Sequence, residues 1–147
     1  MKFPIAMIVV FLGCAAGQAS ASGVKGTIKG SLDGREIDVK ATCFPDKKPW
    51  DWIQVNSEAL SRSEALRDVD GDGIAILAGA SQGMGQATIT AKIGETNYKF
   101  GVGKRGVTFY PTGFKLVGKF DRTEGKGADR KVVHTFQAEL TVSCTGI

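Results

Sequence analysis

Residues 132–144 read Val-Val-His-Thr-Phe-Gln-Ala-Glu-Leu-Thr-Val-Ser-Cys, and this stretch decides the fold class. Apolar side chains occupy every second position, and mostly polar side chains lie between them. Successive side chains of a β-strand point to opposite faces, so the pattern predicts a strand with one buried face. Because His134 falls on that face, we expect a buried or partly buried core histidine. The buried face comprises Val132, His134, Phe136, Ala138, Leu140, Val142 and Cys144.

The beginning of the chain has the features of a secretory signal peptide. A lysine at position 2 precedes an apolar run over residues 3–13, which is too short for a permanent membrane span. Ala21 supplies the small side chain that signal peptidase accepts. We therefore expect a signal peptide over residues 1–21, one β domain over residues 22–147 and no membrane span. The alternative is a lipid anchor on Cys14.

A second alternating stretch, residues 36–43, also ends in a cysteine on its apolar face. Since Cys14 leaves with the signal peptide, Cys43 and Cys144 remain as an even pair, and exported proteins usually bridge such pairs. We therefore predict one disulfide, which closes a loop of about a hundred residues. A disulfide also predicts a secreted, periplasmic or cell-envelope location.

Turn signals separate short alternating stretches along most of the chain. Asp33-Gly34 lies between two of them and is typical of a type I′ hairpin turn, in which both residues take positive φ. The repeated Ser-Glu-Ala-Leu in residues 57–66 predicts one short helix, and residues 121–131, rich in Gly and charge, predict a mobile loop. We expect an all-β fold, an antiparallel β-sandwich or flattened barrel of seven to eight strands.

The charge of the chain argues against nucleic acid as a partner. The 147 residues include 19 Lys and Arg against 15 Asp and Glu, a formal net charge of +4. This excess is too small to indicate nucleic-acid binding. Many lysines alternate with apolar residues, where they would solubilise the outer face of a sheet and discourage edge-to-edge pairing.

Residues 68–73 read Asp-Val-Asp-Gly-Asp-Gly and match the first half of a calcium-binding loop. Carboxylates at alternate positions, here Asp68, Asp70 and Asp72, converge on the ion in such a loop. The second half is missing, because Gly79 stands where a bidentate Glu is needed. We expect an acidic turn between helix and strand, with weak calcium binding as the alternative and no other cofactor.

Trp50-Asp51-Trp52, close to Lys47 and Lys48, places both tryptophans of the protein in one predicted loop. Large aromatic side chains plug the open ends of sandwiches, and they also form binding sites for sugars and proteins. We expect a plug, with a loop that binds a protein or glycan partner as the alternative.

The chain lacks the parts of the common catalytic sites. It has one histidine, no Gly-x-Ser-x-Gly elbow and no His or Cys pair at the spacing of a metal site. The glycine-rich residues 81–86 join two predicted strands instead of opening a helix, which argues against phosphate binding. We expect that the protein is not an enzyme.

Three stretches that span most of the mature chain share motifs with one known family. They are Leu32-Asp33-Gly34-Arg35 with Val39 and Cys43, then Asp68-Val69-Asp70-Gly71 with Gly83-Met84-Gly85-Gln86-Ala87, and then Gly94, Tyr98-Lys99 and residues 136–144. With these motifs the chain resembles the mycobacterial nineteen-kilodalton lipoprotein antigen family. The resemblance implies a disulfide-closed β domain at the cell envelope, with host-facing or adhesive roles carried largely by a lipid anchor, and it transfers no catalytic residue.

These observations predict an exported, non-enzymatic β domain that binds a partner or decorates the cell envelope. One alternative is a secreted inhibitor of a hydrolase such as lysozyme, because residues 94–98, Gly-Glu-Thr-Asn-Tyr, faintly resemble the Ser-Gly-x-x-Tyr loop of lysozyme inhibitors. The other alternative is a lipid carrier with a cavity between its sheets.

Overall fold

The computed structural model describes residues 23–46, 51–61, 72–79 and 86–145, which form one antiparallel sheet of nine strands. The all-β prediction is confirmed, with nine strands instead of seven or eight. A short helix, α2 (Glu58–Ser61), and two 3-10 turns, η3 (Lys104–Gly106) and η4 (Gly127–Asp129), lie between strands. The strands are β1 (Val24–Leu32), β2 (Arg35–Pro45), β3 (Trp52–Ser57), β4 (Gly73–Gly79), β5 (Gln86–Ile93), β6 (Thr96–Val102), β7 (Val107–Tyr110), β8 (Gly113–Glu124) and β9 (Lys131–Cys144).

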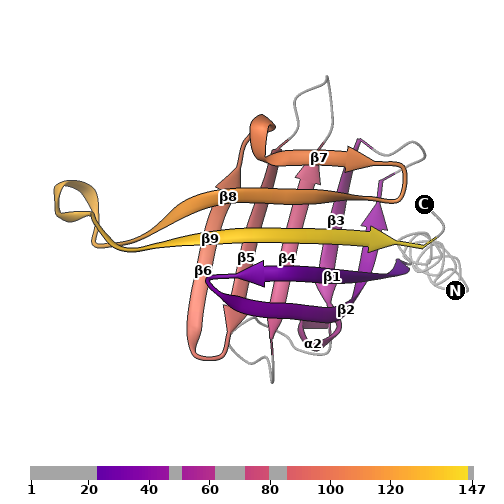
Figure 1. Ribbon diagram of the computed structural model, residues 1–147, viewed down its shortest axis with the longest axis horizontal. Helices are drawn as coiled ribbons and strands as arrows, with labels where there is room; N and C mark the ends of the chain where they lie inside the picture. Colours follow the sequence, from indigo (N-terminus) through magenta and orange to yellow (C-terminus); the bar gives the residue numbers. More distant parts are fainter. Residues whose placement is uncertain (1–22, 47–50, 62–71, 80–85, 146–147) are drawn as a thin grey trace, which may run out of the picture.

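The sheet folds over itself into two layers, with strand order β6-β5-β4-β3-β2-β1-β9-β8-β7. One layer contains β1, β9, β8 and β7, and the strands β3 to β6 of the other layer cross it at a steep angle (Figure 1). β2 takes part in both layers, because it pairs with β1 along its length and with β3 over residues 41–45. The barrel nearly closes where Phe100 of β6 and Phe120 of β8 lie 4.5 Å apart, measured between ring centroids.

Alternation along each strand places one set of side chains between the two layers. The predicted buried face of β9 is confirmed from Phe136 to Cys144. Each fully buried Ile, Leu or Phe contributes about 1.5–3 kcal/mol to the stability of the fold. The largest fully buried side chains are Phe114, Ile28, Leu32, Ile37, Ile53, Ile74, Ile76, Ile89, Leu116, Leu140, Val55 and Val142.

The predicted hairpin turn between β1 and β2 is also confirmed. Asp33 has φ 54° and Gly34 has φ 75°, and Leu32 pairs directly with Arg35. Positive φ at both central residues matches the twist of the flanking strands, which is why Asp-Gly favours this turn. The turn holds the Asp33 side chain at one end of the barrel.

The last hairpin is longer than the sequence predicts. Residues 121–131 were expected to form a loop, but β8 continues to Glu124 and β9 begins at Lys131, so the connection shrinks to residues 125–130. The apolar alternation stops near Phe120 because the paired strands project beyond the rest of the barrel (Figure 1). Backbone pairing continues without a core beneath it, so the hydrophobic pattern underestimates the strand length.

Two predicted segments lie partly or wholly outside the described residues. The helix expected within residues 57–66 begins as α2 at Glu58, while residues 62–71 lie outside the described part of the chain. The expected signal peptide and Cys14 also lie outside it. Among the described helices, none has the length and apolar character that crossing a membrane would require.

Candidate functional site

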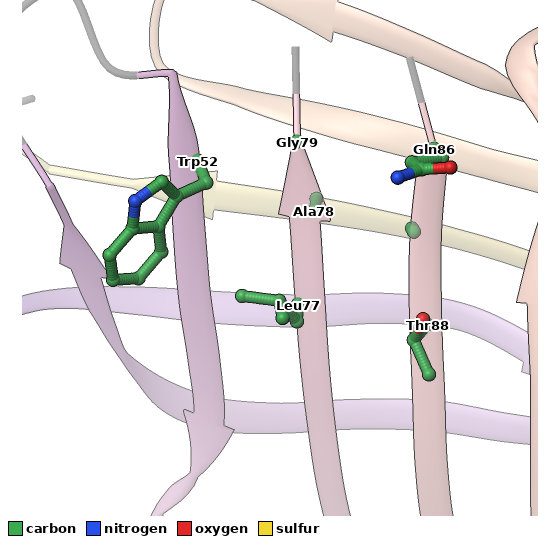
Figure 2. A pocket seen from close by; sticks show the side chains of 7 residues that line it. Trp52, Leu77, Ala78, Gly79, Gln86 and Thr88 are labelled. Atoms are coloured by element: carbon green, nitrogen blue, oxygen red, sulfur yellow. The ribbon is translucent and has the colours of Figure 1, made fainter. Parts of the chain in front are cut away.

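A hollow of about 400 Å³ lies on the outer face of β3, β4 and β5 (Figure 2). The strand register places Trp52, Gly79 and Gln86 in one row across the three strands, and Leu77 pairs with Thr88 in the next row. Because glycine has no side chain, nothing projects from the middle of the first row; the Trp52 indole lies on the side of β3 away from β4, and the Leu77 side chain points toward β3 (Figure 2). The lining residues are Trp52, Leu77, Ala78, Gly79, Gln86, Ala87 and Thr88.

Two large apolar side chains of this hollow are exposed to solvent. Trp52 is 47% exposed and Leu77 is 46% exposed. Single exposed apolar residues are common on protein surfaces, but these two line the same depression. Such a combination of concave shape, apolar surface and a few polar groups is typical of a binding site.

Asp46, the residue directly after β2, holds the backbone at the start of β3. The Asp46 carboxylate oxygen Oδ1 accepts hydrogen bonds from the N–H groups of Asp51 (2.9 Å) and Trp52 (3.3 Å). The N–H of Asp46 donates to the Trp52 carbonyl at 3.2 Å. These bonds hold the backbone at Trp52, while its half-exposed side chain lies on the outer surface. The prediction that the tryptophans plug the open end of the fold therefore does not hold for Trp52, and Trp50 lies outside the described residues.

Outward side chains differ between two parts of the barrel. The outward side chains of β3, β4 and most of β5, here called the neutral face, are uncharged. Moving along β5 away from the hollow, the first charged outward side chain is Lys92. The outward side chains of β1 and β2, here called the charged face, include cations and carboxylates. The neutral face comprises Trp52, Gln54, Asn56, Ala75, Leu77, Gly79, Gln86, Thr88 and Thr90, and the charged face comprises Lys25, Thr27, Lys29, Ser31, Glu36, Asp38, Lys40, Thr42 and Phe44.

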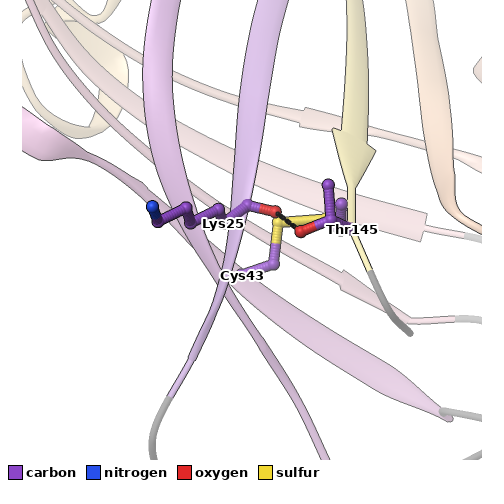
Figure 3. The surroundings of a disulfide bond; sticks show 4 residues. Lys25, Cys43 and Thr145 are labelled. Atoms are coloured by element: carbon purple, nitrogen blue, oxygen red, sulfur yellow. Dashed lines mark hydrogen bonds between the residues drawn. A yellow bond between two sulfur atoms is a disulfide. The ribbon is translucent and has the colours of Figure 1, made fainter.

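The predicted disulfide between Cys43 and Cys144 is confirmed. It joins β2 to β9 across a sequence separation of 101 residues, with 6.1 Å between the Cα atoms. The bridge lies beside Gly26 of β1, where an added Cβ would come within 2.6 Å of the Cys43 sulfur. Thr145 continues past the bridge and binds the Lys25 carbonyl through its N–H (2.8 Å) and its hydroxyl (3.0 Å), as Figure 3 shows in part. The first and last strands of the domain are thereby tied together.

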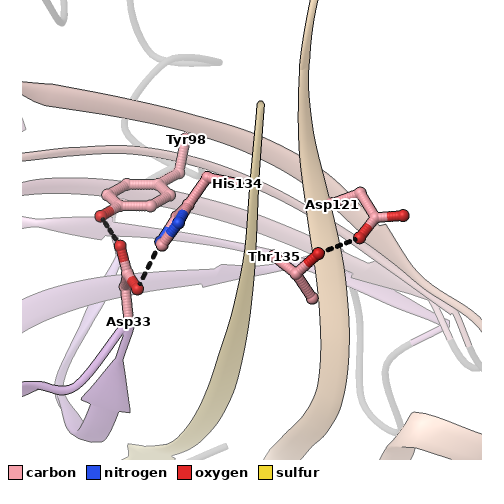
Figure 4. Close-up of polar contacts among 5 residues, drawn as sticks. All are labelled: Asp33, Tyr98, Asp121, His134 and Thr135. Carbon is pink, nitrogen blue, oxygen red and sulfur yellow. Dashed lines mark hydrogen bonds and ion pairs between the residues drawn. The ribbon is translucent and has the colours of Figure 1, made fainter. Parts of the chain in front are cut away.

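A polar cluster lies at the end of the barrel that carries the β1–β2 turn (Figure 4). The Tyr98 hydroxyl donates to Asp33 Oδ2 at 2.6 Å, and His134 Nε2 lies 2.9 Å from Asp33 Oδ1. The Asp33 N–H donates to the Gln137 carbonyl at 2.8 Å. One carboxylate therefore connects the first turn to β6 and to β9.

Electrostatics at this cluster follow from the hydrogen bonds. The Tyr98 hydroxyl, and then His134, lower the pKa of Asp33 against the opposing effect of burial. Burial, and then the Asp33 carboxylate, raise the pKa of Tyr98. Asp33 therefore stays ionised and Tyr98 stays protonated around neutral pH, which preserves both hydrogen bonds.

Of the two expectations for His134, full burial is wrong and partial burial is what the structure shows. Its side chain is 43% exposed, although it has the inward parity of β9. The strand extends past the opposite layer at this point, so only one side of the ring is covered. The imidazole stacks on Phe136 with 6.4 Å between ring centroids. Sequence reasoning missed this exposed His-Asp contact because the two residues are 101 positions apart.

The other predicted site residues are described only in part. Of the calcium motif, Asp72 lies just before β4 and its carbonyl accepts a hydrogen bond from the Ser57 hydroxyl at 3.2 Å. Asp68 and Asp70 lie outside the described residues, as do Trp50, Lys47 and Lys48. Within the described ranges, no three His, Cys, Asp or Glu side chains are grouped as metal ligands.

Comparison with protein-family models, characterised proteins and solved structures finds no match to this chain. The candidate site is therefore defined by the geometry of its own residues alone. Sequence reasoning identified Trp52 but missed Leu77, Gly79 and Gln86, which the register brings next to it. One signal was present, because Leu77 is a large apolar residue at an outward position of its strand.

Proposed function

We propose that the protein is an exported, non-enzymatic domain that binds a partner at the cell envelope through the hollow beside Trp52. One observation carries this proposal: Trp52 and Leu77 are both about half exposed, and they line one hollow on an uncharged face. The disulfide supports a location in an oxidising compartment. An envelope location is also what the resemblance to the nineteen-kilodalton antigen family implies.

The two alternative functions have less support. An inhibitor loop at residues 94–98 would have to present Tyr98 to the target enzyme, but this tyrosine is only 3% exposed and its hydroxyl binds Asp33. A lipid carrier would need free space between the layers. The space between the layers contains closely packed apolar side chains, many of them fully buried.

Sedimentation with envelope fragments tests the proposal. The purified protein is mixed with fragments from its own organism, and the bound fraction is measured after centrifugation. Trp52→Ala should lower the bound fraction several-fold, because truncation removes the largest contact surface of the hollow. Tyr110→Ala is the matched control, because Tyr110 of β7 is equally exposed at 47% and does not line the hollow. Equal retention of both variants and the wild type would contradict the proposal, as would the absence of retention of the wild type.

The mode of export is a separate part of the proposal. We propose cleavage after Ala21, with lipidation of Cys14 as the alternative. The intact mass of the protein isolated from its own cells distinguishes the two forms, because a lipid adds mass and keeps residues 14–21. The mass of a chain that starts at Ser22 supports cleavage, and a larger, acylated mass contradicts it.

A further inference from the structure

The hollow beside Trp52 combines a flat aromatic ring with uncharged polar groups. The face of an indole ring carries negative electrostatic potential, which attracts the weakly positive C–H groups of a ligand stacked on it. The Leu77 side chain points toward β3 and extends the apolar surface beside Trp52, and Gly79 places no side chain between β3 and Gln86 of β5 (Figure 2). This shape accepts a flat ligand with C–H groups on one face.

The polar groups at the hollow can both donate and accept hydrogen bonds. Gln86 offers an amide N–H₂ and a carbonyl oxygen, and Thr88 offers a hydroxyl. On the same face, Gln54 donates from Nε2 to Asn56 Oδ1 at 2.8 Å, so more amide groups lie along β3. Groups of this kind suit ligand hydroxyls, which also donate and accept. A phosphate or carboxylate ligand would instead require cations, and the lining residues that the structure describes include none.

We propose that this hollow binds a neutral sugar residue of a glycan, an inference that rests on the proposed binding function. A pyranose ring has the required properties, because C–H groups cover one face and hydroxyls surround its edge. The volume of about 400 Å³ lies within the range of small-molecule sites. Since the described lining residues are all uncharged, the hollow favours a neutral sugar over a uronic acid, a sulfated sugar or a charged peptide.

A pair of glycine variants tests the hollow without removing a contact. Gly79 and Gly101 both lie on outward positions of strands, and an added Cβ at either would lie 3.8 Å from its nearest backbone oxygen, an ordinary contact distance. Gly79→Val fills the hollow, whereas Gly101→Val adds the same side chain outside its lining. Both variants should fold, because valine is favoured in strands and neither glycine requires positive φ.

The experiment measures competition for envelope retention by soluble sugars. The probes are neutral oligosaccharides of glucose, galactose, mannose and N-acetylglucosamine, with oligogalacturonate as the charged control. We expect at least one neutral probe to displace the protein and to bind it directly in calorimetry, and oligogalacturonate to do neither. Gly79→Val and Trp52→Ala should weaken that binding by about tenfold or more, while Trp52→Phe keeps much of it and Gly101→Val changes it by less than about twofold.

Two other outcomes separate the two proposals. Retention that depends on Trp52 and Gly79 but resists every neutral probe overturns the sugar inference and leaves the binding function in place, with a protein as the remaining class of partner. Retention that is equal in the wild type, Trp52→Ala and Gly79→Val overturns both proposals.

Discussion

The neutral face and the charged face belong to the same barrel and have the same structural task, yet their compositions differ. Both present the outward side chains of strands whose inward side chains form the core. The charged face carries lysines, Glu36 and Asp38, as expected for a surface that only has to remain in water. The neutral face carries Trp52 and Leu77, which folding does not require at exposed positions. The difference is the basis of our proposal that the neutral face is a binding surface.

Stability and binding should therefore respond to different residues. Inward positions and the disulfide determine the free energy of unfolding, whereas under the proposed function the neutral face determines retention on the envelope. Substitutions at inward positions should lower stability and spare retention, and substitutions on the neutral face should do the reverse; a substitution that lowers both equally would contradict this separation.

The largest expected effect on stability comes from the disulfide. Replacing Cys43 and Cys144 together by Ala should lower the free energy of unfolding by about 4 kcal/mol, because the unfolded chain regains the freedom of a loop of 101 residues. Urea denaturation at equilibrium measures this loss. Under conditions where the variant is still folded, its retention on envelope fragments should equal that of the wild type. A loss below about 1 kcal/mol would show that the bridge adds little to the packed core.

Two neighbouring residues of β4 provide the next test. Ile76 is fully buried and Leu77 is about half exposed. Ile76→Ala should lower the free energy of unfolding by about 2–5 kcal/mol, because it leaves a cavity in the core. Leu77→Ala should change it by less than about 1 kcal/mol and lower retention instead. Denaturation and sedimentation are measured for both variants in parallel. Loss of retention by folded Ile76→Ala, or unchanged retention of Leu77→Ala, would contradict the proposed role of the neutral face.

A smaller, pH-dependent effect is expected at the polar cluster. The pKa of Asp33 is lowered in the folded protein, so its ionised form adds stability above the unfolded pKa near 3.8, and this contribution is lost as the pH falls through the lowered value. Asp33→Asn should therefore be less stable than the wild type at neutral pH, and the two should converge in strong acid. Asparagine tolerates the positive φ of this turn position.

Thermal unfolding from pH 2 to pH 7 measures the difference between Asp33→Asn and the wild type. Tyr98→Phe is the companion variant, because it removes the hydroxyl that contributes most to the lowered pKa and keeps the ring in the core. Its difference from the wild type should also shrink on acidification. A difference that stays constant with pH would show that the Asp33 carboxylate contributes nothing specific to stability.

Local patterns in the sequence were sufficient to predict much of the fold. The alternation in residues 132–144 predicted the strand that closes on Cys144, and Asp33-Gly34 predicted the first turn. The cysteines at the ends of two apolar stripes predicted the bridge, because exported chains rarely leave such a pair unpaired. These features depend on near neighbours in the chain or on simple counting.

The arrangement of the candidate site could not be predicted in the same way. Trp52, Gly79 and Gln86 come from three strands, and only the pairing register brings them into one row. A shift by one residue would turn each side chain to the opposite face, and alternation alone does not determine the register between strands. The exposure of His134 has a similar origin, because it depends on how far β9 extends beyond the opposite layer.

Methyl NMR provides the most direct test of the central claim that the neutral face contacts the partner. Leu77 and Val117 are each 46% exposed on outward positions of strands, but only Leu77 lines the hollow. Solubilised envelope fragments are titrated into protein labelled at leucine and valine methyl groups. The Leu77 methyl signals should shift or broaden while those of Val117 stay unchanged. Perturbation of Val117 without Leu77, or of neither residue, would contradict the central claim.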